Sequence, residues 1–224
     1  MIVLHTTKYS ENSLIIHGYS PEKGRVGIIL KGVTGGNGRK RNPKGTAISV
    51  LHPLSIMNVR TLENHKGGME TLKEYTQKHH LNSIRTDITK SSMAMFLSEL
   101  MYRTLLTPEQ DEAMYTFLEK AILLLEGLTG SAANFHIWFI ICYCEKLGFA
   151  PIGDFGSEFD PFSAEEKEIL DRLYNTSFSE AMGLPLTGSS RRRLIEALLK
   201  YMEYHTGSRI HLNSLAVLQT IFSV

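Results

Sequence analysis

Residues 2–31 read IVLHTTKYSENSLIIHGYSPEKGRVGIILK, and this stretch decides the fold of the N-terminal third of the chain. A first turn is expected at Ser10-Glu-Asn12. At the second, Pro21 presets the backbone φ and Gly24 is free to adopt a positive φ, so the chain is expected to reverse there. Runs rich in β-branched and aliphatic residues flank these turns and predict three strands, at 2–9, 12–20 and 25–31.

The strand pattern continues to about residue 75, with further runs at Ala47–Leu51, Ser55–Leu62 and Met69–Tyr75. Pro53 cannot donate a backbone hydrogen bond, and it therefore marks an edge, a bulge or a bend. Five or six short strands within the first 80 residues predict a small antiparallel β-barrel, because closing a sheet on itself removes its exposed edges.

In the remaining two thirds of the chain the apolar residues recur at helical spacing. Asp87 is suited to cap a helix that runs to about Leu106. The next segment, Thr107-Pro-Glu-Gln110, has the composition of a helix start with Pro at the first helical position. It predicts a helix that ends near Glu126.

Further helices are predicted in the later part of the chain. Ala132–Leu147 is apolar almost all round and is expected to form the central buried helix. The others have their own start signals: a capping box at Ser163 for a helix to about Tyr174, Ser189 or Ser190 for a helix to about His205, and Asn213 for a last one. The sequence therefore predicts an α+β protein, with a β-barrel at 1–80 and an all-helical C-terminal domain at 81–224.

The charge is distributed unevenly between these two parts. Residues 1–80 contain 12 Lys and Arg residues against 5 Asp and Glu residues, a net charge of +7. Residues 81–224 contain 12 basic and 18 acidic residues, a net charge of −6. A basic module attached to an acidic domain is expected to bind a polyanion, although the charge alone does not say which one.

The excess positive charge is concentrated at Lys23, Arg25, Lys31, Arg39, Lys40, Arg41 and Lys44, which we interpret as the DNA-binding site. The last four belong to residues 32–45, which contain five glycines and predict a flexible loop. A merely solvated loop is the alternative. Only Tyr9 and Tyr19 precede Tyr75 as aromatic residues, which favours contacts to the phosphate backbone over base reading.

Arg191, Arg192 and Arg193 form a second candidate site, at the start of a predicted helix. Positive charge is unfavourable at this end of the helix dipole, so an anion is expected nearby. Three anions remain open: the acidic stretch Glu158–Asp171 of the same domain, the acidic tail of a partner protein, and DNA phosphate.

The sequence contains no recognisable motif for catalysis, metal binding or cofactor binding, so neither enzyme activity nor a cofactor is expected. Cys142 and Cys144 lie within an apolar segment and are expected to be buried reduced thiols. Asp154, Glu158 and Asp160 leave open a weaker alternative, a magnesium-dependent enzyme that acts on phosphate esters.

The longest apolar stretch, Phe135–Cys144, is far shorter than the roughly 20 residues that a membrane-spanning helix needs. The first residues lack the basic start and apolar run of a signal peptide. A cytoplasmic protein without membrane contact is therefore expected.

Several segments resemble one known family. Leu4-His-Thr-Thr-Lys-Tyr9-Ser-Glu11, Tyr19-Ser-Pro-Glu-Lys-Gly24, Lys31-Gly32 and Leu51-His-Pro53 are similar to the opening of RecO proteins, which mediate DNA recombination. Two later segments resemble the helical part of RecO proteins from Bacteroides-type bacteria. They are Lys90-Ser-Ser-x-Ala-x-Phe96-Leu-Ser-Glu99 and the stretch from Ala133-Asn-Phe-His136 to Leu147-Gly-Phe-x-Pro151.

The resemblance implies an N-terminal OB-fold, a helical C-terminal domain and a role in recombinational DNA repair. It implies binding of single- and double-stranded DNA, annealing of complementary strands, and work with RecR to load RecA onto strands coated by single-strand-binding protein. The acidic tail of that protein is an implied partner of the helical domain. Many relatives carry a four-cysteine zinc site after the Leu-Gly-Phe-x-Pro segment, but residues 152–160 contain no cysteine, so no metal site is expected here. A helical adaptor that binds only proteins remains the alternative.

Overall fold

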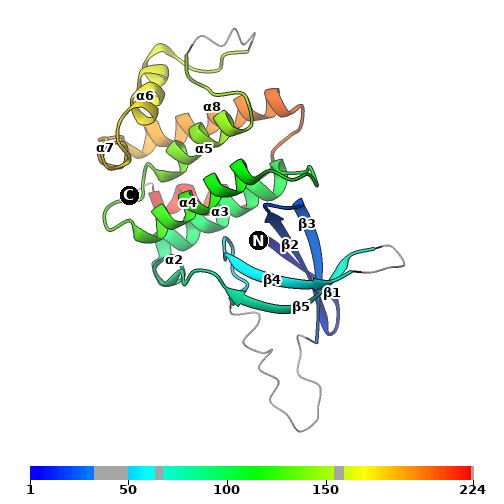
Figure 1. Cartoon of the computed structure of the whole chain (residues 1–224). Helices are drawn as coiled ribbons and strands as arrows, with labels where there is room; N and C mark the ends of the chain where they lie inside the picture. Colours follow the sequence, from blue (N-terminus) through cyan, green and yellow to red (C-terminus); the bar gives the residue numbers. More distant parts are fainter. Residues whose placement is uncertain (33–49, 64–67, 154–158, 223–224) are drawn as a thin grey trace.

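The computed structural model describes residues 1–32, 50–63, 68–153 and 159–222. The described strands are β1 (Ile2–Ser10), β2 (Ser13–Ser20), β3 (Gly24–Lys31), β4 (Met57–Leu62) and β5 (Glu70–Gln77). The helices follow as α2 (Asn82–Thr86), α3 (Ile88–Thr104), α4 (Glu112–Gly127), α5 (Phe135–Lys146), α6 (Ala164–Asn175), α7 (Phe178–Gly183), α8 (Gly188–Thr206) and α9 (Ser214–Phe222). Figure 1 shows α3 and α4 between the sheet and the layer formed by α5 to α8. The predicted α+β class, a sheet followed by helices, is confirmed.

The five strands form one sheet in the order β1-β2-β3-β5-β4. Neighbouring strands are antiparallel except β3 and β5, which run parallel with Ile28 opposite Glu70. The closed antiparallel barrel that the sequence predicted is therefore corrected to a mixed sheet that does not close. The sheet is mixed because β5, the second strand of the β4–β5 hairpin, pairs with β3 and runs in the same direction.

The two ends of the sheet approach each other without forming a continuous ladder. Ile2 and Ile56 form an isolated bridge, and the Val3 N–H donates to the carbonyl oxygen of Ser55 at 2.8 Å. Leu54 has a φ of 65°, the left-handed region that an extended strand does not occupy. Pairing between β1 and the residues before β4 stays local for this reason.

Most of the local predictions hold, with two corrections. The first three strands lie where the turns predicted them. The strand expected at Ala47–Leu51 falls mostly outside the described residues, and Leu51 lies in no strand. The helix expected to start at Thr107 begins instead at Glu112, because Asp111 is the cap and accepts a hydrogen bond from the Met114 N–H at 2.8 Å. The carbonyl oxygen of Thr107 accepts a bond from the Arg25 N–H, so this segment docks against the sheet.

The helix starts that depend on side-chain caps were predicted best. Asp87 accepts bonds from the N–H groups at the start of α3, and Ser163 forms a capping box with Glu166 at the start of α6. Thr187, rather than Ser189 or Ser190, caps α8. A capping box at Ser177 that the sequence reading did not use opens the short helix α7.

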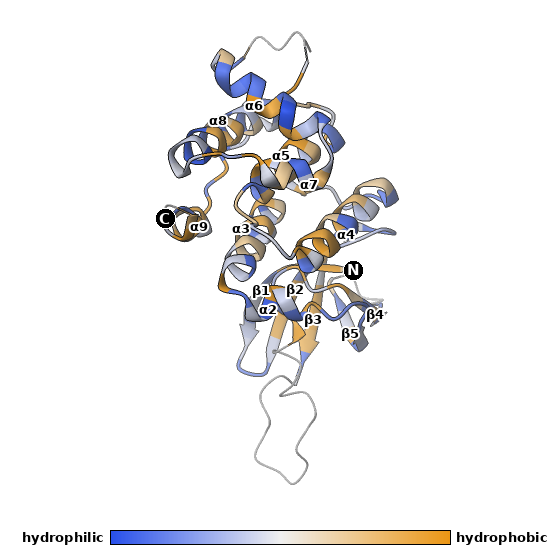
Figure 2. Ribbon diagram, turned by 90° about the vertical axis from the view of Figure 1, so that its left-hand side faces the viewer, coloured by the Kyte–Doolittle hydropathy of each residue, from blue (hydrophilic) through white to orange (hydrophobic). Residues whose placement is uncertain are grey.

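Alternate residues of β1 belong to two different cores, as the period of a strand requires. Ile2 and Leu4 join the large core that runs through the helices, whereas Met1 and Val3 join a smaller core within the sheet. Figure 2 shows the apolar residues on α3, α4 and α5 that fill much of the large core. Because this core takes residues from both sides of position 80, the division into domains at 1–80 and 81–224 stays a prediction.

Glu126, near the end of α4, holds the start of α2 in place. Its carboxylate accepts hydrogen bonds from the backbone N–H groups of Ser83 and Ile84, at 2.8 Å each. The N-cap residue of α2, Leu81, supplies no side-chain cap, so Glu126 satisfies these N–H groups from a distant helix. The buried ammonium of Lys90 donates to Ser83 Oγ at 2.6 Å and to the Glu126 carbonyl oxygen at 2.9 Å. The network joins α2, α3 and α4.

Replacing Glu126 with alanine is expected to lower the free energy of unfolding by about 2–3 kcal/mol, because partly buried N–H groups lose a charged acceptor. Urea denaturation measures the change. The control is Glu168→Ala, on the exposed side of α6, which should alter stability by no more than about 0.5 kcal/mol. If the two variants lose equally little stability, Glu126 does not hold α2.

Candidate nucleic-acid interface

Lys23, in the turn between β2 and β3, is paired within the sheet. Its ammonium forms an ion pair with Glu70, the first residue of β5. The hydrogen bond from Lys23 and a second one from Thr61 lower the pKa of Glu70, so this carboxylate stays charged. The positive charge of Lys23 is therefore largely balanced by Glu70.

Arg25, at the start of β3, points toward the helices. Its guanidinium carbon lies 4.2 Å from the centroid of the Tyr102 ring on α3, a cation–π contact. Burial lowers the pKa of Arg25, and its Nη1 has no hydrogen-bond partner within the described part of the chain. Arg25 thus belongs to the junction between the sheet and α3.

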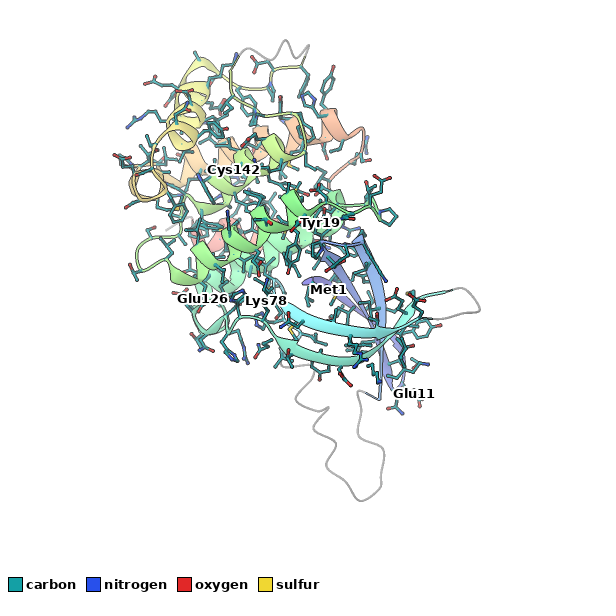
Figure 3. All side chains as sticks on the ribbon, in the orientation of Figure 1. Met1, Glu11, Tyr19, Lys78, Glu126 and Cys142 are labelled. Carbon is teal, nitrogen blue, oxygen red and sulfur yellow. The ribbon has the colours of Figure 1, made fainter. Side chains whose placement is uncertain are left out.

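Lys31 is exposed at the other end of β3. It lies opposite Ser13 of β2, beside the turn that contains Glu11. Figure 3 shows Glu11 at the end of the sheet that points away from the helices. At about 3.3 Å per residue, Lys31 and Arg25 are about 20 Å apart along the strand. Arg39, Lys40, Arg41 and Lys44 lie outside the described residues. The structure therefore does not bring the three described members of the predicted site together in one patch.

The three arginines of the second candidate site each have a partner in their own chain. The Arg191 guanidinium donates to the Leu186 carbonyl oxygen at 2.5 Å. Arg192 pairs with Glu196 at 3.1 Å, and Arg193 lies 4.0 Å from Glu166, which belongs to the acidic stretch named above. Arg192 and Arg193 remain exposed, and exposed ion pairs are weak, so both can exchange partners.

The structure gives little support to the alternative of a magnesium-dependent enzyme that uses Asp154, Glu158 and Asp160. Asp160 pairs with Lys167, whose hydrogen bond lowers the pKa of Asp160, while Asp154 and Glu158 lie outside the described residues. Among the residues that the structure places, no group of three or more His, Cys, Asp or Glu side chains could hold a metal ion. Cys142 is half-buried and Cys144 is buried, and burial raises the pKa of the Cys142 thiol to about 12. These thiols are protonated at neutral pH.

Sequence reasoning missed a cluster of rings and cations at the junction of sheet and helices. It consists of His5 on β1, His17 on β2, Arg25 on β3, and Tyr102 and Arg103 on α3, and is called the junction cluster below. The ring centroids of His5 and His17 lie 4.7 and 5.3 Å from that of Tyr102. The guanidinium carbon of Arg103 lies 5.7 Å from the same centroid. His5 and His17 are paired across the strands, but no local signal links them to a helix nearly 100 residues later.

The electrostatics of the cluster keep its two imidazoles neutral at neutral pH. Burial, together with the charges of Arg103 and Arg25, lowers the pKa of His5. Burial and the charge of Arg25 likewise lower the pKa of His17, whose Nε2 lies 3.1 Å from Thr7 Oγ1. The cluster therefore combines neutral rings with two permanent cations.

The helices of the described residues give no indication of a membrane span, since none is both long and apolar enough to cross a bilayer.

Comparison with known proteins places both parts of the chain in one family. The family model described as "Recombination protein O N terminal" matches residues 1–80, and the one described as "Recombination protein O C terminal" matches residues 85–159. The chain is 28% identical to the DNA repair protein RecO of Flavobacterium psychrophilum, over 99% of this chain and 97% of the relative. The RecO proteins of Porphyromonas gingivalis and Bacteroides fragilis are 26% and 27% identical, with the same coverage. The resemblance to Bacteroides-type RecO proteins is confirmed, and the chain belongs to the RecO family of DNA repair and recombination proteins.

Proposed function

We propose that this protein is a recombination mediator that binds single- and double-stranded DNA and anneals complementary strands. With RecR, it helps to load RecA onto DNA coated by single-strand-binding protein. The observation that carries the proposal is the match to RecO proteins over 99% of the chain. The net charge of +7 in residues 1–80 supports it, because a cationic module attracts phosphate.

In this proposal the sheet works as an OB-fold-like platform, and the four cations at residues 39–44 add to its positive charge. Lys31, exposed at one end of β3, is the described basic residue closest in sequence to that segment. Annealing requires no covalent chemistry, so the protein acts without an enzymatic site. Cations that neutralise phosphate on two strands reduce their repulsion and raise their rate of encounter.

An annealing assay tests the proposal directly. Two complementary single strands carrying a donor and an acceptor dye are mixed with and without the full chain. We expect the protein to accelerate annealing at low salt, and the acceleration to decline as salt screens the phosphate contacts. A protein that leaves the annealing rate unchanged at every salt concentration would instead fit an adaptor that binds only proteins.

For the second candidate site we propose a partner role for Arg192 and Arg193, the two exposed arginines at the start of α8. The double variant Arg192→Glu/Arg193→Glu is expected to weaken binding of the acidic tail peptide of single-strand-binding protein, or of DNA, roughly tenfold. This change corresponds to about 1.4 kcal/mol of binding free energy. Arg191 is kept because its bond to Leu186 is structural. Isothermal titration calorimetry with the peptide and with DNA measures both affinities. Normal affinity for both would assign these arginines to intramolecular pairing alone.

A further inference from the structure

The junction cluster borders a groove with a volume of about 620 Å³. His5, Tyr102 and Arg103 form its polar side, between β1 and α3. Apolar side chains line the rest, and they include Val3, Leu51, Pro53, Met95 and Val217. Met95 and Val217 are each 47% exposed, so the apolar lining is open to solvent.

The groove lining contains one cation, Arg103, and one carboxylate, Glu99, which is held by the start of α9. Glu99 lies in the lining, and its carboxylate accepts bonds from the N–H groups of Asn213 and Ser214, at 3.0 and 2.8 Å. It also accepts a bond from Ser214 Oγ at 2.5 Å. Burial disfavours the charged form, but the bonds from Ser214 and Asn213 outweigh burial and lower the pKa of Glu99. Glu99 is thus engaged at the start of α9, and the exposed Arg103 is the cation of the lining that can meet an external anion.

The arrangement has the chemistry of an unpaired nucleotide. A base needs an aromatic face and an apolar slot, and its phosphate needs a cation within a few ångströms of both. Here the exposed imidazole of His5 and the guanidiniums of Arg25 and Arg103 lie 4.2–5.7 Å from the Tyr102 ring. Of these four residues, His5, Tyr102 and Arg103 line the apolar groove. Bases in a duplex are stacked on one another, so they cannot enter such a groove.

We propose that the junction cluster and its groove bind an unpaired nucleotide of single-stranded DNA. The base stacks on His5 beside Tyr102 and contacts the apolar lining, while the phosphate meets Arg103. This inference rests on the proposed DNA binding and adds a site for the base to the phosphate contacts. It gives the protein a preference for unpaired strands that the basic segment alone would not provide.

Three labelled DNA probes separate this site from general attraction to phosphate. They are a single-stranded oligonucleotide, a duplex of the same length, and a single strand of abasic residues, which keeps the phosphates and lacks the bases. His5→Ala is expected to weaken binding of the single strand about tenfold, in line with the effect of losing one base–aromatic stack. Affinities for the duplex and the abasic strand should change less than about twofold.

The matched control is Tyr9→Ala, which removes a 59% exposed ring from the same strand outside the groove lining and should leave all three affinities unchanged. His5 is exposed, so the His5→Ala variant can be read even if changes at the more buried Tyr102 impair folding. Circular dichroism verifies that each variant is folded.

The pH dependence of single-strand affinity gives a further test, because it would not change if His5 and His17 had only a structural role. Burial and, after it, the arginine charges lower the pKa of His5. A phosphate in the groove beside His5 offsets the arginine charges, so bound DNA should raise the pKa of this imidazole. Binding then takes up protons, and single-strand affinity should rise as the pH falls through the pKa that His5 has in the complex. The charged and titratable groups that face the rings of His5 and His17 are Arg25, Arg103, Glu99 and Tyr102. His5→Gln with His17→Gln should flatten the rise.

The outcomes distinguish the site from the function. If the wild-type protein binds none of the probes, the proposed DNA binding itself fails. If it binds them and His5→Ala changes nothing, or weakens all three equally, the base site is overturned while DNA binding stands. An acidic peptide that loses affinity in His5→Ala, with single-strand affinity unchanged, would assign the groove to a protein partner and overturn the proposal.

Discussion

Replacing Arg39, Lys40, Arg41 and Lys44 together with alanine is expected to weaken DNA binding roughly a hundredfold at low salt and to flatten its salt dependence. Each lost phosphate contact removes about 0.7 from the slope of log affinity against log salt for single strands, and about 0.9 for duplex. If all four cations contact phosphates, the magnitude of the slope should decrease by about 3 for single strands and by about 3.5 for duplex. Fluorescence anisotropy titrations at a series of salt concentrations measure it.

A control of equal charge change lies in the helical part of the protein. Replacing the exposed residues Lys120, Lys146, Arg172 and Lys200 with alanine also removes four positive charges. We expect that variant to retain most of the wild-type slope, because its charges lie on α4, α5, α6 and α8. Equal slopes in the two quadruple variants would show that net charge, and not the segment at 39–44, governs binding.

Gly24→Ala is expected to lower the free energy of unfolding by about 2–5 kcal/mol. Gly24 has a φ of 58°, and a Cβ there would lie 2.2 Å from the carbonyl oxygen of Glu109 and 2.8 Å from that of Thr107. Both neighbours are backbone atoms of the segment between α3 and α4, so they cannot move aside as a flexible side chain would. The clash would separate the sheet from the helices. Urea denaturation measures the loss.

Gly207→Ala isolates the backbone part of this effect. Gly207 also has a positive φ, 64°, but a Cβ there would meet nothing within 4 Å. Its replacement should cost only about 1 kcal/mol from backbone strain. A Gly24→Ala variant no less stable than Gly207→Ala would mean that the turn between β2 and β3 does not dock against residues 107–109.

The parts of the fold that the sequence predicted well are those that local chemistry determines. Asp87 and Ser163 act on N–H groups within three residues, so their caps could be read directly. Thr107-Pro-Glu-Gln110 looked like a helix start by the same reasoning. That prediction was wrong because the Thr107 carbonyl oxygen accepts a hydrogen bond from the backbone N–H of Arg25, a residue far away in sequence. The parallel pairing of β3 with β5 depends on contacts across the whole sheet, which turn residues do not encode.

In the candidate site, too, the sequence predicted local features and missed those that depend on long-range contacts. Counting charges found a basic N-terminal third, but it could not show that Lys23 pairs with Glu70, 47 residues later. The small number of aromatic residues before Tyr75 favoured contacts to the phosphate backbone over base reading. Tyr102 is contributed by the helical part and lies against His5 only because α3 packs on β1. The strands and the helix together therefore form a ring cluster that neither segment predicts alone.

The salt dependence of DNA binding tests most directly whether the basic N-terminal part of this protein attracts DNA through its phosphates. The full chain is titrated against labelled single- and double-stranded DNA from low to physiological salt, and log affinity is plotted against log salt. We expect straight lines with slopes of about −3 or steeper, as several neutralised phosphates require. A flat line, or no binding at the lowest salt concentration, would contradict phosphate-driven binding.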